Sequence, residues 1–238
     1  MEIHPSLWTM LIAKLLHKEV HDLLLVDHII ASGLVFLTLL VLSLVVRANI
    51  SLVPGRLQQV IELVLTFLLD MLEENIGKDG RKYMPLIGTL AFFIFTANFL
   101  GMVPGFSAAT GNFNTTVACA LVVFFYYNYL GLREHGPSYV KHFTGSIAWL
   151  APLMIIIEII GHLARPFSLG IRLFGNIGGE HLITGVIYKF IPLLLAGMIP
   201  VVLPVPMMVL GLFAALLQTY VFIMLTQVYI AGALSHDH

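Results

Sequence analysis

The sequence predicts an all-α polytopic membrane protein with five to six membrane helices and no soluble domain. Of its 238 residues, 59% are hydrophobic and 11% are charged, and the mean hydropathy is +0.96. A soluble domain carries about 25% charged residues. The apolar residues also gather in runs of about 20, which is the length a helix needs to cross a hydrocarbon core of about 30 Å. Together these observations exclude a water-soluble globular protein.

The first half of the chain divides into a leader and three membrane spans. Residues 1–28 are expected to form an extracytoplasmic leader, and residues 29–238 a single membrane domain. The leader is rich in acidic residues and histidine, so the apolar run that follows it is not a cleavable signal peptide. Apolar runs place the spans at residues 29–46, 84–103 and 116–132.

Two longer apolar stretches fill the second half, over residues 147–187 and 191–233. The first has charged residues embedded in it, and the second has prolines near its start. Each stretch is longer than one upright crossing requires. The number of crossings is therefore left at five or six.

An amphipathic helix is expected between the first two spans, over residues 56–76. Polar side chains recur there at intervals of three and four through apolar ones, which is the helical period. They are Arg56, Gln59, Glu62, Thr66, Asp70 and Glu73. Pro54-Gly55 opens the segment and Gly77 closes it. We expect the helix to lie along the cytoplasmic face, although a surface helix packed on the spans has the same pattern.

The basic residues of the short loops set the expected orientation. Five lie between the first two spans, and the loop of residues 104–114 has no charge. Two more, Arg133 and Lys141, follow the third span. Because Lys and Arg gather on the cytoplasmic side, the N-terminus is expected outside and, with five crossings, the C-terminus in the cytoplasm.

Charge and cysteine content exclude several other classes. The formal net charge of −1 gives no electrostatic basis for binding nucleic acid. The single cysteine, Cys119, excludes a disulfide framework or a CxxC site. No cofactor or metal site is expected.

A row of polar side chains inside the first long stretch is the most informative feature. At about 100° per residue, its six members fall within roughly 40° of one line on a helix, over about 33 Å. They are Glu158, His162, Arg165, Arg172, Asn176 and Glu180. Charges inside a membrane cost on the order of 2.5–3.5 kcal/mol each, so this stripe must face water, a partner charge or both. Glu158 could instead pair with His162 or Arg165 across one turn merely to neutralise charge.

Arg172 differs from the other members of the stripe. It has no carboxylate three or four residues away on either side, and a guanidinium cannot lose its charge by deprotonation. Its counter-ion must come from elsewhere in the fold or from another subunit. Gln218 is the only strongly polar side chain between Val205 and Leu225, where a lone amide commonly joins two helices. Pro166 predicts a kink or a local opening of backbone bonds within the stripe.

Residues 165–176, Arg-Pro-Phe-Ser-Leu-Gly-Ile-Arg-Leu-Phe-Gly-Asn, resemble the signature of subunit a of the F-type ATP synthase. Further parts of the chain follow the order of that family: Pro54-Gly55, the stretch from Asn98 to Pro104, and Gln218 followed by Tyr229-Ile230. The resemblance covers the chain from about Asp27 to its end. It implies that the last two apolar stretches form a long, tilted, membrane-embedded helical hairpin at the C-terminal end.

The resemblance also implies a role for each residue of the site. Arg172 would face the carboxylate of each passing c subunit and separate two half-channels for protons, with Gln218 beside it. Asn176, Glu180 and His181 would line the half-channel to the outside. Glu158, His162 and Ser168 would border the one to the cytoplasm.

Further implications concern assembly and location. The chain would be a non-catalytic stator subunit that couples proton flow to ATP synthesis. Its partners would be a ring of c subunits, the peripheral-stalk b subunits, the rest of the complex and the lipid bilayer. Its location would be the bacterial plasma (inner) membrane.

One position departs from the pattern of the family. Some members carry a histidine on the last helix, two turns before the glutamine, that faces an acid nine residues after the arginine. Here those positions are Gly211 and His181, and Glu180 supplies the acid one residue earlier. Either Glu180 or His181 could therefore relay the proton.

Two other classes of protein remain as alternatives. An ion-coupled secondary transporter also buries Arg, Glu and Asn, but it usually shows inverted repeats, and none is visible in this sequence. A haem-binding membrane anchor would need histidines that face each other across helices. The histidines in or near spans are His28, His135, His142, His162 and His181. The choice between H⁺ and Na⁺ as the coupling ion is left open.

Overall fold

The computed structural model is all-helical in the part that it describes, which is residues 27–103, 106–136, 151–194 and 204–235. Within α7 and α8, the side chains of residues 151–152, 180–181, 184–185, 187–194 and 204–207 lie outside the description. The long helices are α3 (Asp27–Ala48), α4 (Arg56–Ile76), α5 (Met84–Met102), α6 (Phe113–His135), α7 (Ala151–Leu194) and α8 (Pro204–Leu234). Among the described residues, five helices are long and apolar enough to cross a membrane, all of these except α4. The predicted class of all-α polytopic membrane protein is confirmed. Residues 1–26 of the predicted leader lie outside the described residues, and its last two residues belong to α3.

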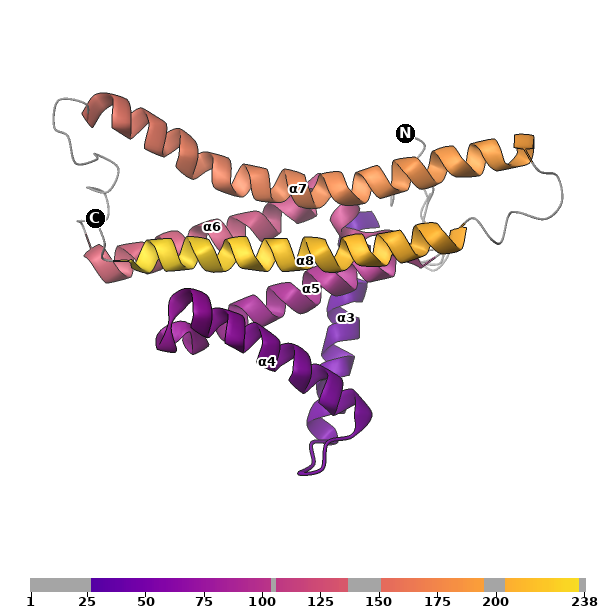
Figure 1. Ribbon diagram of the computed structural model, residues 1–238, viewed down its shortest axis with the longest axis horizontal. Helices are drawn as coiled ribbons and strands as arrows, with labels where there is room; N and C mark the ends of the chain where they lie inside the picture. Colours follow the sequence, from indigo (N-terminus) through magenta and orange to yellow (C-terminus); the bar gives the residue numbers. More distant parts are fainter. Residues whose placement is uncertain (1–26, 104–105, 137–150, 195–203, 236–238) are drawn as a thin grey trace, which may run out of the picture.

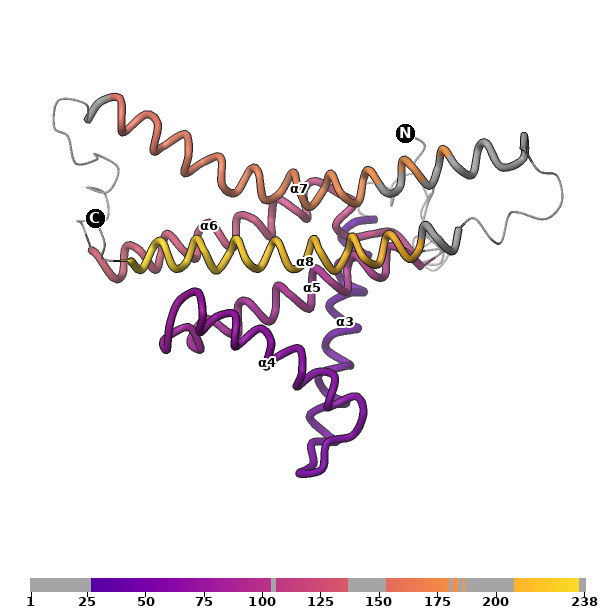
Figure 2. Tube along the Cα trace, viewed as in Figure 1, coloured from indigo at the N-terminus to yellow at the C-terminus, as the bar shows by residue number. Residues whose placement is uncertain are grey.

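Four of the helices form one bundle, and α3 crosses it. Figure 1 shows α5, α6, α7 and α8 running alongside one another, while α3 passes behind them at a steep angle. The trace in Figure 2 shows α7 and α8 as the two antiparallel arms of a hairpin. Within the bundle, α6 packs on α7 and α5 packs on α8. The core contains Ile94 of α5, Tyr127 of α6, Leu173 of α7 and Phe222 of α8, and all four are at most 1% exposed.

The helix α4 lies against the bundle by its C-terminal half. It buries Leu68, Met71 and Leu72, but Leu63 and Phe67 stay exposed. Exposed apolar side chains of α4 border an apolar groove of about 950 Å³ between α4, α5 and α8. The helix ends at Gly77, whose φ of +88° is a conformation that favours glycine.

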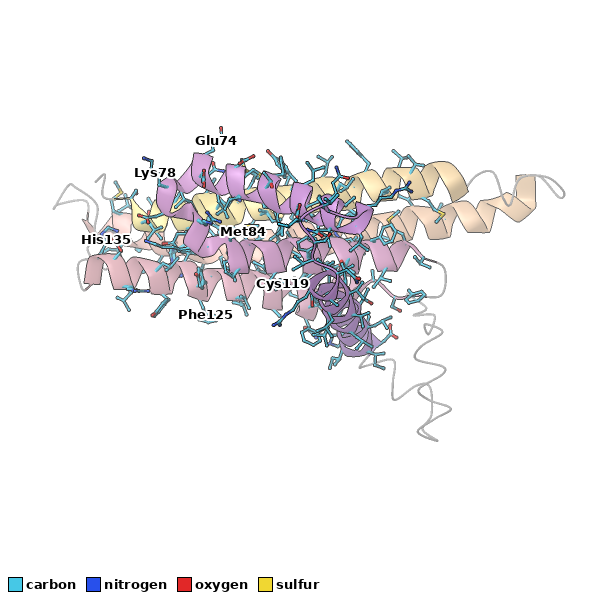
Figure 3. The ribbon with its side chains drawn as sticks, turned by 90° about the horizontal axis from the view of Figure 1, so that it is seen from below. Glu74, Lys78, Met84, Cys119, Phe125 and His135 are labelled. Atoms are coloured by element: carbon cyan, nitrogen blue, oxygen red, sulfur yellow. The ribbon has the colours of Figure 1, made fainter. Side chains whose placement is uncertain are left out.

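A polar contact fixes the end of α4 to α8. The Asn75 side chain donates a hydrogen bond to Oε1 of Gln227 over 2.8 Å, and Gln227 is fully buried. Directly after α4 comes the 3₁₀ helix η1 (Lys78–Tyr83). Figure 3 shows Glu74, Lys78 and His135 gathered at the same end of the molecule. The connection between α4 and α5 therefore lies at the end of the bundle where α6 terminates.

The connection between α5 and α6 folds back onto the bundle at the opposite end. Its 3₁₀ helix η2 (Ala109–Gly111) packs against α3, α5, α6 and α7. The buried Thr110 donates a hydrogen bond to Oδ1 of buried Asn98 over 2.6 Å. A Cβ on Gly101 would lie 2.3 Å from the Cβ of Ala108, so only glycine allows this approach.

The two helices of the hairpin begin and end at other residues than the sequence predicted. The first arm, predicted over 147–187, continues in the structure to Leu194, so residues 191–194 belong to it and not to the second arm. Residues 147–150 lie outside the described residues. The second arm begins at Pro204, because proline suits the first turn of a helix, where its missing N–H has no partner to lose.

The length of α7 requires it to tilt if it is embedded in a bilayer. Its 44 residues extend about 66 Å at about 1.5 Å each, more than twice the hydrocarbon thickness of about 30 Å. Pro166, which was predicted to kink the helix or open its backbone, lies inside this single helix. Figure 1 shows α7 bowed, with both ends diverging from α8. The helix is thus bent but not divided.

Candidate functional site

The predicted stripe lies on the single helix α7, along the boundary between its buried and exposed faces. Leu169, Leu173 and Ile177 are buried against the bundle. Of the stripe, His162 turns to the buried side and is 8% exposed, while Glu158 and Arg172 are exposed. His162 and Arg172 are ten residues apart, which places them roughly 80° from each other around the helix. One edge of the stripe therefore faces the helix bundle, and the other faces away from it.

Arg172 presents its charge outward from the bundle. Among the residues that the structure describes, no carboxylate lies within ion-pair distance of its guanidinium. The described part of this chain thus provides no counter-ion for it. Because arginine keeps its charge, this position on a membrane helix suits an anion supplied by another molecule.

Directly beyond Arg172, one turn along α7, a hydrogen bond joins the two arms of the hairpin. The Asn176 side chain donates it to Oε1 of Gln218 on α8. Gln218 is 2% exposed, and its Nε2 has no hydrogen-bond partner among the described residues. Gln218, which was expected to lie beside Arg172, thus contacts the side chain one turn beyond it, Asn176.

His162 sits in a polar and aromatic pocket made by α6. Its Nε2 lies 2.7 Å from Oδ1 of Asn128 and 3.4 Å from the hydroxyl of Tyr127. The rings of Phe124 and Tyr127 each meet the imidazole edge to face, with centroids 5.3 Å away. These contacts of the imidazole thus come from an amide, a phenol and two aromatic rings of one neighbouring helix.

The proposed neutralising pairs of Glu158 do not form. Within the described part of α7, Glu158 makes no ion pair with His162 or Arg165. Arg165 instead places its guanidinium carbon 5.6 Å from the ring centre of Tyr229 on α8, a cation–π contact. The charge of Glu158 therefore stays exposed on the helix.

Three further predicted site residues, Ser168, Glu180 and His181, also lie on α7. Ser168 is exposed on α7, between His162 and Asn176. Glu180 and His181 belong to α7, but their side chains lie outside the described residues.

Sequence reasoning missed the α6 side of this site. Tyr127 and Asn128 contact His162, yet neither was among the candidate residues. The available signal was weak: Asn128 is an amide within an apolar span. Its importance depends on the packing of α6 against α7, which the sequence does not reveal.

Comparisons with known proteins identify the family of this chain. Residues 28–231 match the family described as ATP synthase A chain. ATP synthase subunit a of Citrifermentans bemidjiense is 40% identical over 236 residues, covering 99% of this chain and all of that protein. ATP synthase subunit a 1 of Syntrophotalea carbinolica is 46% identical over 211 residues, covering 89% of this chain and 87% of that one.

A third relative extends the agreement to another genus. ATP synthase subunit a of a Sulfurihydrogenibium species is 43% identical over 210 residues, covering 88% of this chain and 98% of its own. Among the described residues, the family match takes in the five helices that are long enough to cross a membrane, apart from Asp27 at the start of the first and residues 232–234 at the end of the last. The chain therefore belongs to the ATP synthase A chain family.

Proposed function

We propose that this chain is the stator subunit of the membrane sector of a rotary ATP synthase, and that Arg172 faces a rotating ring of c subunits. The observation that carries the proposal is an exposed guanidinium on a membrane helix with no described counter-ion. A carboxylate on each rotor subunit supplies that counter-ion in turn. The permanent charge of Arg172 favours ionisation of the arriving carboxylic acid, which then releases its proton.

Two offset half-channels bring protons to the rotor carboxylates and take them away. Asn176, Glu180 and His181 line the one to the outside, and Glu158, His162 and Ser168 border the one to the cytoplasm. Gln218 lies beside Arg172. The exposure of Glu158 and the burial of His162 near one end of α7 support the second assignment. Arg172 lies between the two groups along α7 and prevents a direct leak of protons.

The rotor can turn through lipid only when its carboxylate is neutral. Desolvation penalises mainly the charged form, so a protonated carboxyl enters the bilayer at low cost. Each charge that crosses 100 mV supplies about 2.3 kcal/mol, and several must cross for each ATP made in the catalytic head. The chain performs no bond chemistry itself, and no cofactor or metal takes part.

The assembly follows from the same role. The partners are the c-ring, the peripheral-stalk b subunits and the rest of the ATP synthase complex, within the lipid of a bacterial plasma (inner) membrane. The N-terminus lies outside and the C-terminus in the cytoplasm. The position of Lys78 and His135 at one end of the molecule supports a cytoplasmic end there, and the exposed apolar side chains of α4 suit a helix at the membrane surface.

The test replaces the charge of Arg172 in the assembled complex. Arg172→Ala should abolish ATP synthesis driven by a proton gradient in membrane vesicles, while the c-ring still co-purifies with the chain. Arg172→Lys should also fail if the extended, planar guanidinium is required. Arg133→Ala, at an exposed arginine in the last turn of α6, is the matched control and should retain synthesis. Coupled synthesis retained in Arg172→Ala would overturn the proposal.

A further inference from the structure

An apolar groove lies beside the N-terminal half of α4. It has a volume of about 950 Å³ and is lined by side chains of α4, α5 and α8, together with Leu42 of α3. On α8 the lining includes Phe213, Leu217 and Tyr220, and each of them is exposed. An empty groove would lose the dispersion contacts of these side chains, so lipid or protein has to cover it in a membrane.

The groove narrows along α4. Leu68 and Met71, in the second half of the helix, are buried against the bundle, whereas Leu57 and Val60, near its start, are exposed. Figure 1 shows α4 close to the bundle at its C-terminal end and diverging from α8 toward its start. A further α-helix would be about 10–12 Å wide along its whole length, so it would not fit a space that narrows. A lipid acyl chain is thin and flexible and can follow the narrowing.

The length of the groove suits one acyl chain. Leu57 and Phe67 both line it and are exposed, and the ten residues between them extend about 15 Å along α4. One leaflet supplies half of a hydrocarbon core of about 30 Å, which is the same length. Among the described helices, α4 is not one of the five that are apolar enough to cross a membrane. It therefore suits a position beside one leaflet.

Arg56, the first residue of α4, carries the only charge among the described residues that line the groove. In the described part of the chain its guanidinium makes no ion pair, and the first turn of α4 has no acidic side chain. Glu62, further along α4, accepts a hydrogen bond from Gln58 over 2.7 Å. A guanidinium keeps its charge and can bind a phosphate through two parallel hydrogen bonds. One end of the groove thus suits a phosphate, and the rest suits hydrocarbon.

We propose that this groove binds an anionic phospholipid, with the phosphate on Arg56 and one acyl chain between α4, α5 and α8. The lipid fills the space that protein side chains leave between the first half of α4 and the bundle. With the orientation proposed above, it belongs to the cytoplasmic leaflet, whose anionic headgroups gather at basic residues near the spans. None of the described residues of α7 lines the groove, so this site is separate from the proposed proton path.

Photochemical cross-linking tests the headgroup end of the site. Phosphatidylglycerol that carries a diazirine on one acyl chain is added to phosphatidylcholine vesicles that contain the assembled complex. After irradiation, mass spectrometry identifies the labelled peptides, and the same diazirine on phosphatidylcholine gives the comparison. Residues 57–67 of α4 and 213–223 of α8 should be labelled more by the phosphatidylglycerol probe.

Two variants show whether Arg56 causes this preference. Arg56→Gln should lower the preference for phosphatidylglycerol by about fivefold, a change that the loss of one lipid-facing cation accounts for. Arg133→Gln is the matched control, because it removes an exposed arginine that does not line the groove. It should leave the preference unchanged.

Val60→Trp tests the hydrocarbon end of the site. Val60 lines the groove and is 62% exposed, so a larger side chain there can occupy the space of the acyl chain without disturbing the core. Labelling of residues 213–223 by the phosphatidylglycerol probe should fall several-fold. Leu63→Trp is the matched control on the same helix, at a position that is 71% exposed and outside the groove, and should leave the labelling unchanged.

Three results would overturn the proposal. Equal labelling by the two probes, or a preference that Arg56→Gln leaves intact, would mean that Arg56 selects no lipid. Labelling that Val60→Trp does not reduce would place the acyl chain elsewhere. An absence of label from both probes on residues 57–67 and 213–223 would mean that another subunit covers the groove. The stator function is tested separately, because Arg172→Ala should abolish synthesis and leave the lipid labelling unchanged.

Discussion

Asn176 on α7 donates a hydrogen bond to the buried side chain of Gln218 on α8, and so ties together the two arms of the hairpin beside Arg172. The bond uses only the oxygen of Gln218, whose Nε2 has no partner among the described residues. A buried amide donor without a partner is costly.

The bond between Asn176 and Gln218 should appear as a coupling free energy. Asn176→Ala and Gln218→Ala should each lower the free energy of unfolding, and the loss in the double variant should be smaller than the sum by about 1 kcal/mol. Thermal denaturation in lipid micelles gives the unfolding free energy of the unaltered chain, the two single variants and the double variant. Asn176→Ala combined with Asn75→Ala, which share no partner, is the additive control. Equal additivity in both sets would show that the contact contributes nothing.

Replacing only Asn75 should lower the free energy of unfolding more than replacing both Asn75 and Gln227. Asn75→Ala leaves the fully buried amide of Gln227 without its partner and should cost about 1–3 kcal/mol of unfolding free energy. Adding Gln227→Leu removes the orphaned amide, so the double variant should be more stable than Asn75→Ala alone. Denaturation midpoints of the two proteins give the comparison.

Asn49→Ala is the matched control for that experiment, because Asn49 is exposed just beyond α3. It should change the midpoint little. A double variant less stable than Asn75→Ala would contradict the account, since it would mean that the amide of Gln227 contributes without Asn75.

Gly101 should tolerate no side chain. A Cβ there would lie 2.3 Å from the Cβ and 2.7 Å from the Cα of Ala108, and the latter is backbone that cannot move aside freely. Gly101→Ala should therefore lower the free energy of unfolding by about 1–3 kcal/mol. Gly33→Ala in α3, where nothing lies within 4 Å, should instead be neutral or stabilising by up to about 1 kcal/mol. Equal midpoints for the two variants would contradict the close approach.

Local signals in the sequence were enough for several elements. The helix α4 runs from Arg56 to Ile76, as the Pro-Gly pair before it and Gly77 after it indicate. The helical spacing from Glu158 to Glu180 also predicted one helix, and α7 covers all of it. In these cases the start, the stop and the period are set by neighbours in the chain.

Tertiary packing decided what the sequence could not. The spacing placed His162 and Arg172 on one stripe of α7. It could not show that His162 would be buried and Arg172 exposed, because this depends on where the neighbouring helix packs. The partners of His162 come from α6, more than thirty residues earlier. The boundary between α7 and α8 was also misplaced: the apolar stretches put a break at residues 188–190, whereas α7 continues through these residues to Leu194.

The length of α7 bears on the order in which neighbouring helices meet its residues. A single upright helix is about 10 Å wide with its side chains, so a helix of about 66 Å lying steeply tilted passes several upright neighbours at once. In the proposed stator, a rotor helix near one end would meet Glu158 while another, further along, would meet Arg172. Each rotor carboxylate would then meet the residues of α7 one after another, so their order along the helix would set the order of the steps.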